Sequence, residues 1–468
     1  MKHQSLGNKG YFIENGTRVG KLSFKHFWRN YKLQQNPFYD EKFFLWWRSY
    51  RWQLIIVMLI AAIINYIDRV NLSFAAIDIR QELLFSQSQM GFLLAAWMWP
   101  YAIANLPSGW LIDKIGINKI FIWSVSLWSI ATIATGLTTS YESIYLSRLL
   151  LGIAEAPFFI IGAKVVQLYF SENMRGISSS IINMGPKIAN GFAPPLIAFL
   201  IILTSWRSMF ILLGIAGFFI VLLWIKIYKK NDAAFLIHHT STTNIPNIKF
   251  SLWKLFNHKT TWWINLGNFG SSYVFWLYFT WLPTYLMDKR GLDLKATGWI
   301  AAMPFIAGVI AVPLGGYISD WLIRKHDFNV IKARVYPAVG GCIIAGCTVI
   351  PINYVDSLTA AVVLFSISTF SVSARAGVLW ALVTDVAPRN VIGTFGGIQN
   401  FASFMGGALA STLSGIILQR TNNYNIVFWI SGILAIAAAF CYAQINKPIL
   451  ATELIGNNHN TDECHSMP

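Results

Sequence analysis

The sequence has few charged residues. They make up 12% of its 468 residues, and only 20 residues are Asp or Glu, whereas hydrophobic residues make up 55%. A water-soluble domain of this length does not need so much apolar surface, but a protein whose outer faces meet lipid does. The scarcity of charge therefore excludes an ordinary soluble protein and predicts a membrane protein.

Cysteine and histidine are also scarce. Cys342, Cys347 and Cys441 lie in apolar runs and Cys464 lies near the C-terminus, so no disulfide framework is indicated. All eight His lie outside the apolar runs, so a proton relay through the membrane cannot use His. The sequence has no Gly-x-x-x-x-Gly-Lys-[Ser/Thr] loop, which argues against an ATP-driven pump. We expect no cofactor, no metal site and no catalytic residues.

The apolar residues form about twelve runs, each about 20 residues long, which is the length that spans a bilayer. The runs begin near Trp52, Met90, Lys119, Ile144, Ile177, Ser208, Trp262, Ala296, Tyr336, Leu358, Gly393 and Asn425. The longest polar break follows the sixth run. We therefore predict an all-α membrane protein with twelve transmembrane helices in two six-helix bundles, residues 52–228 and 260–446. A cytoplasmic linker, residues 229–259, joins them, and cytoplasmic tails, residues 1–51 and 447–468, flank them.

The net charge of +16 is not evenly spread and does not predict a nucleic-acid partner. With the tails inside, about 25 of the 36 Lys and Arg fall in cytoplasmic segments and about 6 in outer loops, which is the positive-inside pattern. No secretory signal peptide is recognisable before the first run. We expect a multi-pass protein of the cell inner membrane with both termini in the cytoplasm. The basic, aromatic N-terminal tail is expected to lie on anionic lipid.

One short pattern occurs once in each half. Residues 109–116 read GWLIDKIG and residues 316–320 read GYISD, followed by Arg324 and Lys325. Both lie between the second and third spans of a half, which indicates an internal duplication, and two repeats that rock can expose a central site to each side in turn. The glycines should let helices approach closely. Asp113 and Asp320 should cap or pair with basic groups across the cytoplasmic seam, as gating latches.

Charged residues inside the runs are the first candidates for function. An ionisable side chain at the centre of a bilayer costs about 2.5–3.5 kcal/mol on insertion scales, so it usually faces a cavity or a partner. Asp68 and Arg69 lie in the outer half of span one. Arg148 and Glu155 lie two turns apart on one face of span four, with room between them for an anion or another residue. A purely structural charge network is the alternative interpretation.

Three further cations lie in the spans. Lys187 is near the middle of span five, where it can bind an anion or neutralise Glu155. Lys164 and Arg375 are nearer the inner ends, so snorkelling or pairing is expected for both. Burial raises the pKa of a carboxylic acid and a nearby cation lowers it, so a carboxylate between these limits can take up and release a proton. Asp68 and Glu155 are the candidates for this proton coupling.

Several motifs resemble those of the major facilitator superfamily. The Gly-x-x-x-Asp loop is its hallmark, and the chain further resembles the anion:cation symporter branch, which includes bacterial sugar-acid transporters and the vesicular anion carriers of animals. The matching segments, within roughly residues 52 to 446, are 65–73 (NYIDRVNLS), 147–157 (SRLLLGIAEAP), 281–283 (WLP), 380–388 (WALVTDVAP) and 393–401 (GTFGGIQNF).

The resemblance implies a role for particular residues. The carboxylates that match Asp68 and Glu155 are the proton sites in the sugar-acid carriers. The aromatic hydroxyls of Tyr66 and Tyr101 and the amide of Asn400 contact the carboxylate and hydroxyls of the substrate. Apart from the resemblance, their positions inside the spans make Arg69 and Lys187 the remaining expected substrate-binding residues and Arg148 an expected gating residue.

The resulting hypothesis is secondary active transport: proton-coupled symport of a small organic anion, a sugar acid or related carboxylate, by alternating access and as a monomer. A uniporter, an exchanger or a sodium-coupled carrier of a phosphate-like anion is the alternative. A membrane enzyme or sensor is disfavoured, because the spans hold no His and the Cys have no evident partner.

Overall fold

The computed structural model describes residues 13–14, 17–18, 49–170, 172–228, 255–326, 328–387 and 392–449. The chain divides into two units, Met1–Gln53 and Leu54–Pro468. In the first unit, β1 (Ile13–Glu14) and β2 (Thr17–Arg18) form a two-residue antiparallel pair. Most of the predicted tails and of the predicted linker lie outside the described residues, and so does the expected contact of the N-terminal tail with lipid.

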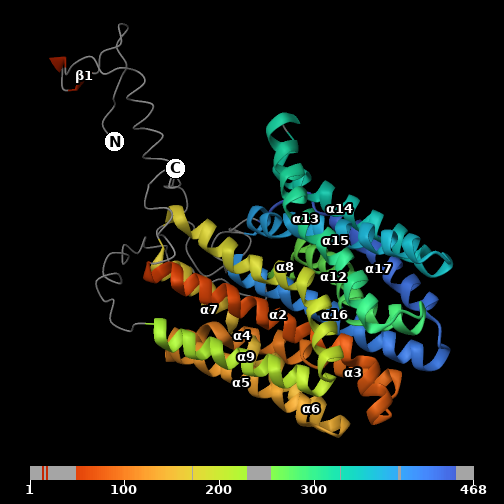
Figure 1. Ribbon diagram of the computed structural model, residues 1–468. Coiled ribbons are helices and arrows are strands. Elements are labelled where there is room, and N and C mark those ends of the chain that lie inside the picture. The colour runs from red at the N-terminus through yellow and green to blue at the C-terminus, as the bar shows by residue number, and fades with distance from the viewer. Residues whose placement is uncertain are drawn as a thin grey trace. The chain divides into compact units, whose positions relative to one another are not determined.

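Long helices make up the second unit, and Figure 1 shows them lying side by side. The red to yellow-green helices form the N-terminal half: α2 (Tyr50–Leu83, which begins in the first unit), α3 (Gln87–Ala95), α4 (Met98–Ile115), α5 (Ile117–Leu137), α6 (Tyr141–Glu155), α7 (Phe158–Tyr169), α8 (Glu172–Leu203) and α9 (Trp206–Ile227). The green to blue helices form the C-terminal half: α12 (Lys259–Asp288), α13 (Leu294–His326), α14 (Val330–Val349), the 3-10 helix η3 (Ile350–Tyr354), α15 (Leu358–Val386), α16 (Ile392–Thr421) and α17 (Tyr424–Ala443).

The helices correspond to the twelve predicted spans. Ten helical segments of the described residues, counting α6 with α7 and α14 with η3, are long and apolar enough to cross a bilayer. The other two spans are α3 with α4, and α12, which has 30 residues. The ninth span begins earlier than predicted, at Val330 rather than near Tyr336. The physical reason is that Arg334, which indicates a loop in the sequence, pairs with Asp320 and Asp385 and so is tolerated within the helix.

Helix caps fix the short connections. Ser86 forms a capping box with Gln89 at the start of α3. Ser140, Ser205 and Ser357 each accept a hydrogen bond from a backbone N–H in the first turn of α6, α9 and α15. These hydroxyls satisfy N–H groups that a helix leaves without an internal partner.

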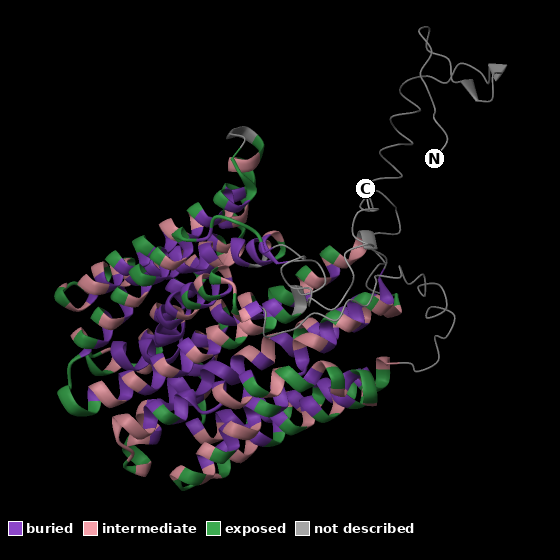
Figure 2. Ribbon diagram, turned by 180° about the vertical axis from the view of Figure 1, so that it is seen from behind, coloured by how far each residue is buried: buried purple, intermediate pink, exposed green. Residues whose placement is uncertain are grey.

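Charged residues gather at the two ends of the helical bundle. The Arg80 end holds Arg80, Glu82, Asp288 and Arg290, and the Asp113 end holds Asp113, Lys164, Asp320 and Arg334. Buried residues gather between the helices, and exposed ones lie on the outer surfaces (Figure 2). Large apolar side chains on those outer surfaces, such as Phe219 and Trp299, are more than 60% exposed. Such a surface suits lipid rather than water.

The two halves contact each other toward the Arg80 end. There α8 packs against α13, and α16 packs against α3 and α4. Among the described residues, three polar contacts cross between the halves: Ser73 Oγ donates to the Phe279 carbonyl (3.1 Å), Arg80 pairs with Asp288 (3.3 Å), and the Ser88 N–H donates to Gln419 Oε1 (3.4 Å). At the Asp113 end, the ion pairs of the described residues stay within one half. The halves are therefore joined at one end of the bundle.

The repeated loop motif differs from its expected packing. A Cβ on Gly109 would meet nothing within 4 Å, and one on Gly316 would meet only a carbonyl oxygen, 3.8 Å away. The close helix contact in this region is instead made by Gly315, whose Cβ would clash with the backbone of Ala374 on α15. The predicted close approach is therefore absent at Gly109, and in the second half it falls on Gly315, one position before the motif glycine Gly316.

Candidate functional site

A buried ion pair joins α2 to α6. Arg69 Nε donates to Glu155 Oε2 at 2.7 Å, and the two residues are 2% and 0% exposed. A charge-assisted hydrogen bond of this length compensates for part of the cost of taking two charges out of water. The sequence predicts interior charges on both helices but not this pairing, because the two residues lie 86 positions apart.

Aromatic rings enclose the Arg69 guanidinium. Its Cζ atom lies 4.7 Å from the ring centre of Tyr66, 4.8 Å from that of Trp97 and 4.6 Å from that of Tyr101. Faces of aromatic rings attract a cation at such distances. Phe404 of the other half packs against Tyr101, with ring centres 4.5 Å apart and the ring planes tilted by 51°. The cationic group is thus held by Glu155 and by rings at the junction of the two halves.

A second acid and a second base lie beside this pair. Arg148 Nη1 donates to the backbone carbonyl of Asp68 at 3.2 Å, and Arg148 stacks over Phe210 at 4.9 Å. The Asp68 carboxylate accepts from Asn71 at 3.3 Å. Asp68 and Arg148 are both 0% exposed. Two buried acids and two buried bases therefore share one region of the N-terminal half and balance each other's charge.

The cluster still has spare hydrogen-bonding capacity. Among the described residues, Asp68 Oδ2, Glu155 Oε1 and both terminal nitrogens of Arg69 are buried without a hydrogen-bond partner. Unpaired buried polar atoms are costly, so each of them calls for an explanation, such as a functional role of that atom. Either carboxylate thus has an oxygen free to accept a proton.

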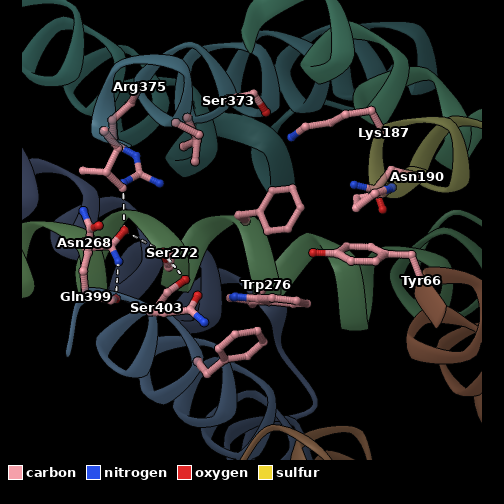
Figure 3. Close-up of a pocket in the computed structure, with 17 residues that line it drawn as sticks. Tyr66, Lys187, Asn190, Asn268, Ser272, Trp276, Ser373, Arg375, Gln399 and Ser403 are labelled. Atoms are coloured by element: carbon pink, nitrogen blue, oxygen red, sulfur yellow. Dashed lines mark hydrogen bonds between the residues drawn. The ribbon is translucent and has the colours of Figure 1, made fainter. Parts of the chain in front are cut away.

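A cavity of about 240 Å³ lies between the two halves, next to this cluster. Ligand pockets typically measure about 300–1,000 Å³, so this one suits a small molecule. Tyr66, Lys187 and Asn190 line it from the N-terminal half. The described lining residues of the C-terminal half are Asn268, Ser272, Phe275, Trp276, Val372, Ser373, Arg375, Ala376, Leu379, Gln399, Asn400, Ser403 and Phe404. Figure 3 shows Lys187, Asn190 and Tyr66 reaching from one side toward Arg375 and Gln399 on the other.

The predicted substrate-binding residues divide into two groups. Tyr66, Lys187 and Asn400 line the cavity. Arg69 and Tyr101 are not among its lining residues and lie behind Tyr66 in the buried cluster. In this arrangement the cation expected to contact the substrate is bound by Glu155 instead, and its contact with a substrate stays a prediction.

Arg375 differs from its predicted role. Snorkelling or pairing at an inner end is expected, but Arg375 is 4% exposed and lines the cavity. Its Nη1 donates to Asn268 Oδ1 and to the Tyr442 hydroxyl, both at 2.9 Å. The sequence hides this role because Asn268 and Tyr442 lie on other helices, far along the chain.

The predicted latches pair within their own halves. Asp113 on α4 contacts Lys164 on α7, which is the pairing expected for Lys164. Asp320 on α13 accepts from Arg334 on α14 at 2.6 Å, and Asp385 on α15 accepts from the same Arg334 at 3.1 Å. Neither aspartate crosses the seam between the halves in this conformation, so the expected cross-seam pairing is not present here. Their role in gating stays a prediction.

Comparisons with known proteins agree with the fold and the motifs. The Major Facilitator Superfamily model matches residues 58–411. A protein named "Probable L-galactonate transporter" of Escherichia coli (strain K12) is 31% identical over 405 residues, which cover 84% of this chain and 89% of that protein. The "Hexuronate transporter" of Bacillus subtilis (strain 168) is 27% identical over 404 residues, which cover 85% of this chain and 95% of that protein.

A solved structure shares the fold. It is a bacterial homologue of the human lysosomal transporter Spinster in an inward-facing and occupied conformation, with a TM-score of 0.71 and 17% identity over 84% of this chain and 96% of that one. At this identity the likeness concerns the fold alone. From the family match and the identity to named transporters, the chain belongs to the Major Facilitator Superfamily and is a multi-pass membrane transporter rather than an enzyme.

Proposed function

We propose that this chain is a proton-coupled symporter of a small organic anion, a sugar acid or a related carboxylate, that works by alternating access. One observation carries the proposal: the buried pair of Arg69 and Glu155 lies directly behind Tyr66, which lines the cavity between the halves. Tyr66 thus connects a titratable acid and an anion-binding cation to the cavity.

The cavity suits a hydroxylated anion. Its described wall carries Lys187 and Arg375 but no Asp or Glu, together with several amide and hydroxyl side chains. Cations attract a carboxylate, and amides and hydroxyls bind sugar hydroxyls. The names of the relatives, which refer to L-galactonate and hexuronate, support the same class of substrate.

The geometry suggests how a proton and an anion are coupled. A proton on Glu155 removes the negative charge that holds Arg69 at 2.7 Å. The positive charge of Arg69, which lies over the ring of Tyr66, then attracts an anion in the cavity. Loss of the proton restores the pair and ends this attraction. Asp68, beside Arg148, is the second proton site.

We place the chain in the cell inner membrane as a monomer, with the Asp113 end and both termini in the cytoplasm. The excess of Lys and Arg in the segments at that end supports this orientation. Since the halves are joined toward the Arg80 end, the described conformation is then the inward-facing one.

Glu155→Gln tests the coupling. The amide keeps the shape of the protonated acid but cannot release a proton. The variant in proteoliposomes should bind substrate and exchange it across the membrane, yet lose accumulation driven by a pH gradient. Glu142→Gln is the matched control, because Glu142 lies on the same helix α6 and is exposed. It should keep both activities.

Counterflow and gradient-driven uptake of labelled L-galactonate, measured in the same vesicles, separate the outcomes. If Glu155→Gln accumulates substrate along a pH gradient at the wild-type level, Glu155 is not the coupling site. Sodium-coupled transport or plain exchange then replaces the proposal.

A further inference from the structure

Lys187 places a cation in the cavity without an acidic partner. It lies on α8 between Pro186 and Asn190, which also line the cavity. None of the ion pairs among the described residues involves Lys187, although the same half holds the buried acids Asp68 and Glu155. Its ammonium points into the open space in Figure 3.

Arg375 places a second cation on the opposite wall, and its position is fixed. Asn268 accepts from Arg375, and the Asn268 amide donates to the Gln399 carbonyl at 2.7 Å. Ser272 also donates to Asn268, at 3.3 Å, and accepts from Ser403 at 2.8 Å. These partners are uncharged, so they orient the guanidinium without neutralising it. Its Nε has no hydrogen-bond partner among the described residues.

The two cations repel each other. Lys187 and Arg375 line the same cavity, and its described wall carries no acid to offset either charge. Like charges in a cavity of low dielectric constant are unfavourable unless an anion enters. One carboxylate balances one of these charges, whereas a molecule with two anionic groups balances both.

Two buried amide side chains line the same cavity as Lys187 and Arg375 and indicate which group of a substrate they bind. Asn190 is 8% exposed and Gln399 is 2% exposed, and both line the cavity. Asn190 Oδ1 and Gln399 Nε2 have no hydrogen-bond partner among the described residues. One is an acceptor and the other a donor, and a hydroxyl group serves both because it donates and accepts.

We propose that the preferred substrate is a dianion, a short polyhydroxylated chain with an acidic group at each end, which is bound between Lys187 and Arg375 with its hydroxyls at Asn190 and Gln399. This inference rests on the proposed transport of sugar acids and narrows that class to acids with two carboxylates. Lys187 is then the residue that determines this specificity.

Calorimetric titration of the purified full-length protein tests the preference. The probes are galactarate, which has a carboxylate at each end of a six-carbon chain, and galactonate, which has one. Galactarate should bind the wild-type protein at least about tenfold more tightly. Lys187→Met should reduce this ratio to about one, chiefly by weakening galactarate. Lys187→Arg, which keeps the charge, should retain the preference.

Thermal unfolding separates a folding defect from a loss of specificity. Without ligand, Lys187→Met removes the repulsion with Arg375, so its melting temperature should equal or exceed that of the wild type. Equal affinities of the wild type for the two acids, or an equal loss for both in Lys187→Met, would overturn the dianion inference alone. If neither acid binds, the proposed sugar-acid function fails together with it.

Discussion

At the scale of single residues, the pair of Arg69 and Glu155 matters because neither charge has an alternative ionic partner at comparable distance among the described residues. Its two members are almost fully buried, and each is the other's closest compensating charge, with Asp68 and Arg148 further off in the same cluster. Removing one member of such a pair costs about 3–5 kcal/mol, because the other charge stays buried alone. A partly exposed pair such as Arg80 and Asp288 contributes about 0–1 kcal/mol.

Arg69→Ala should therefore abolish substrate binding and destabilise the protein by about 3–5 kcal/mol. Adding Glu155→Gln removes the stranded carboxylate, so the double variant should regain most of the stability but not the binding. Melting temperatures of the purified variants measure the first effect and calorimetric titration with L-galactonate the second. Arg80→Ala serves as the control and should melt near the wild type. A double variant less stable than Arg69→Ala would refute the dependence of one charge on the other.

The sequence predicts which residues are buried charges, but not how they are arranged. Asp68, Arg69, Arg148 and Glu155 interrupt apolar runs, so their importance follows from the cost of burial alone. Spacing along one helix predicts the shared face of Arg148 and Glu155. It does not reveal that Arg69 from another helix reaches Glu155, because that contact depends on how the helices pack.

At the scale of the helices, two spans are interrupted near the cluster. α3 ends before Trp97, and α6 ends at Glu155, before Pro157. A proline lacks the N–H that would bond to the carbonyl four residues earlier, so Pro100 and Pro157 leave the carbonyls of Ala96 and Ile153 without that partner. Both prolines are visible in the sequence. The sequence does not show their joint effect, because that effect depends on how the helices pack. Gly152 of α6 packs against Trp97, where α3 ends and α4 begins.

Gly152→Ala should destabilise the protein by about 1–3 kcal/mol, the usual cost of overpacking. A Cβ there would stand 2.8 Å from Pro100 Cγ and would clash with the Trp97 carbonyl. Gly109→Ala is the matched control on α4, because a Cβ there meets nothing within 4 Å. It should be neutral or slightly stabilising, since Ala is favoured over Gly in a helix. Unfolding curves of the two variants check this, and equal melting temperatures would contradict the packing argument.

At the scale of the whole transporter, the twelve-helix fold was predictable because the length of each apolar run follows from the thickness of a bilayer. The cavity was only partly predictable. Tyr66, Lys187 and Asn400 were candidates from the sequence, whereas Asn268 and Gln399 are uncharged amides that do not stand out among the other polar residues of the spans. Their importance appears only when α12 and α16 are placed side by side.

Cysteine labelling tests the orientation and the closed end together. In a background with the four cysteines replaced by alanine, Lys289→Cys at the Arg80 end should react with a membrane-impermeant maleimide in intact cells. Arg324→Cys at the Asp113 end and Ser403→Cys in the cavity should react only after the membrane is permeabilised, since the halves are joined toward the Arg80 end. Labelling of Arg324→Cys in intact cells would reverse the proposed orientation.

The uneven distribution of buried charge has a consequence for how the substrate specificity of such a carrier evolves. Among the described residues, both buried acids lie in the N-terminal half, whereas most of the polar cavity wall belongs to the C-terminal half. Under the proposed function, proton coupling lies in the N-terminal half, whereas substrate recognition is shared between Lys187 and Asn190 of that half and the larger C-terminal part of the cavity wall. Mutations in α12, α15 and α16 can therefore change the substrate preference while the proton-coupling residues stay intact. A duplicated gene can in this way acquire a new substrate without first losing proton coupling.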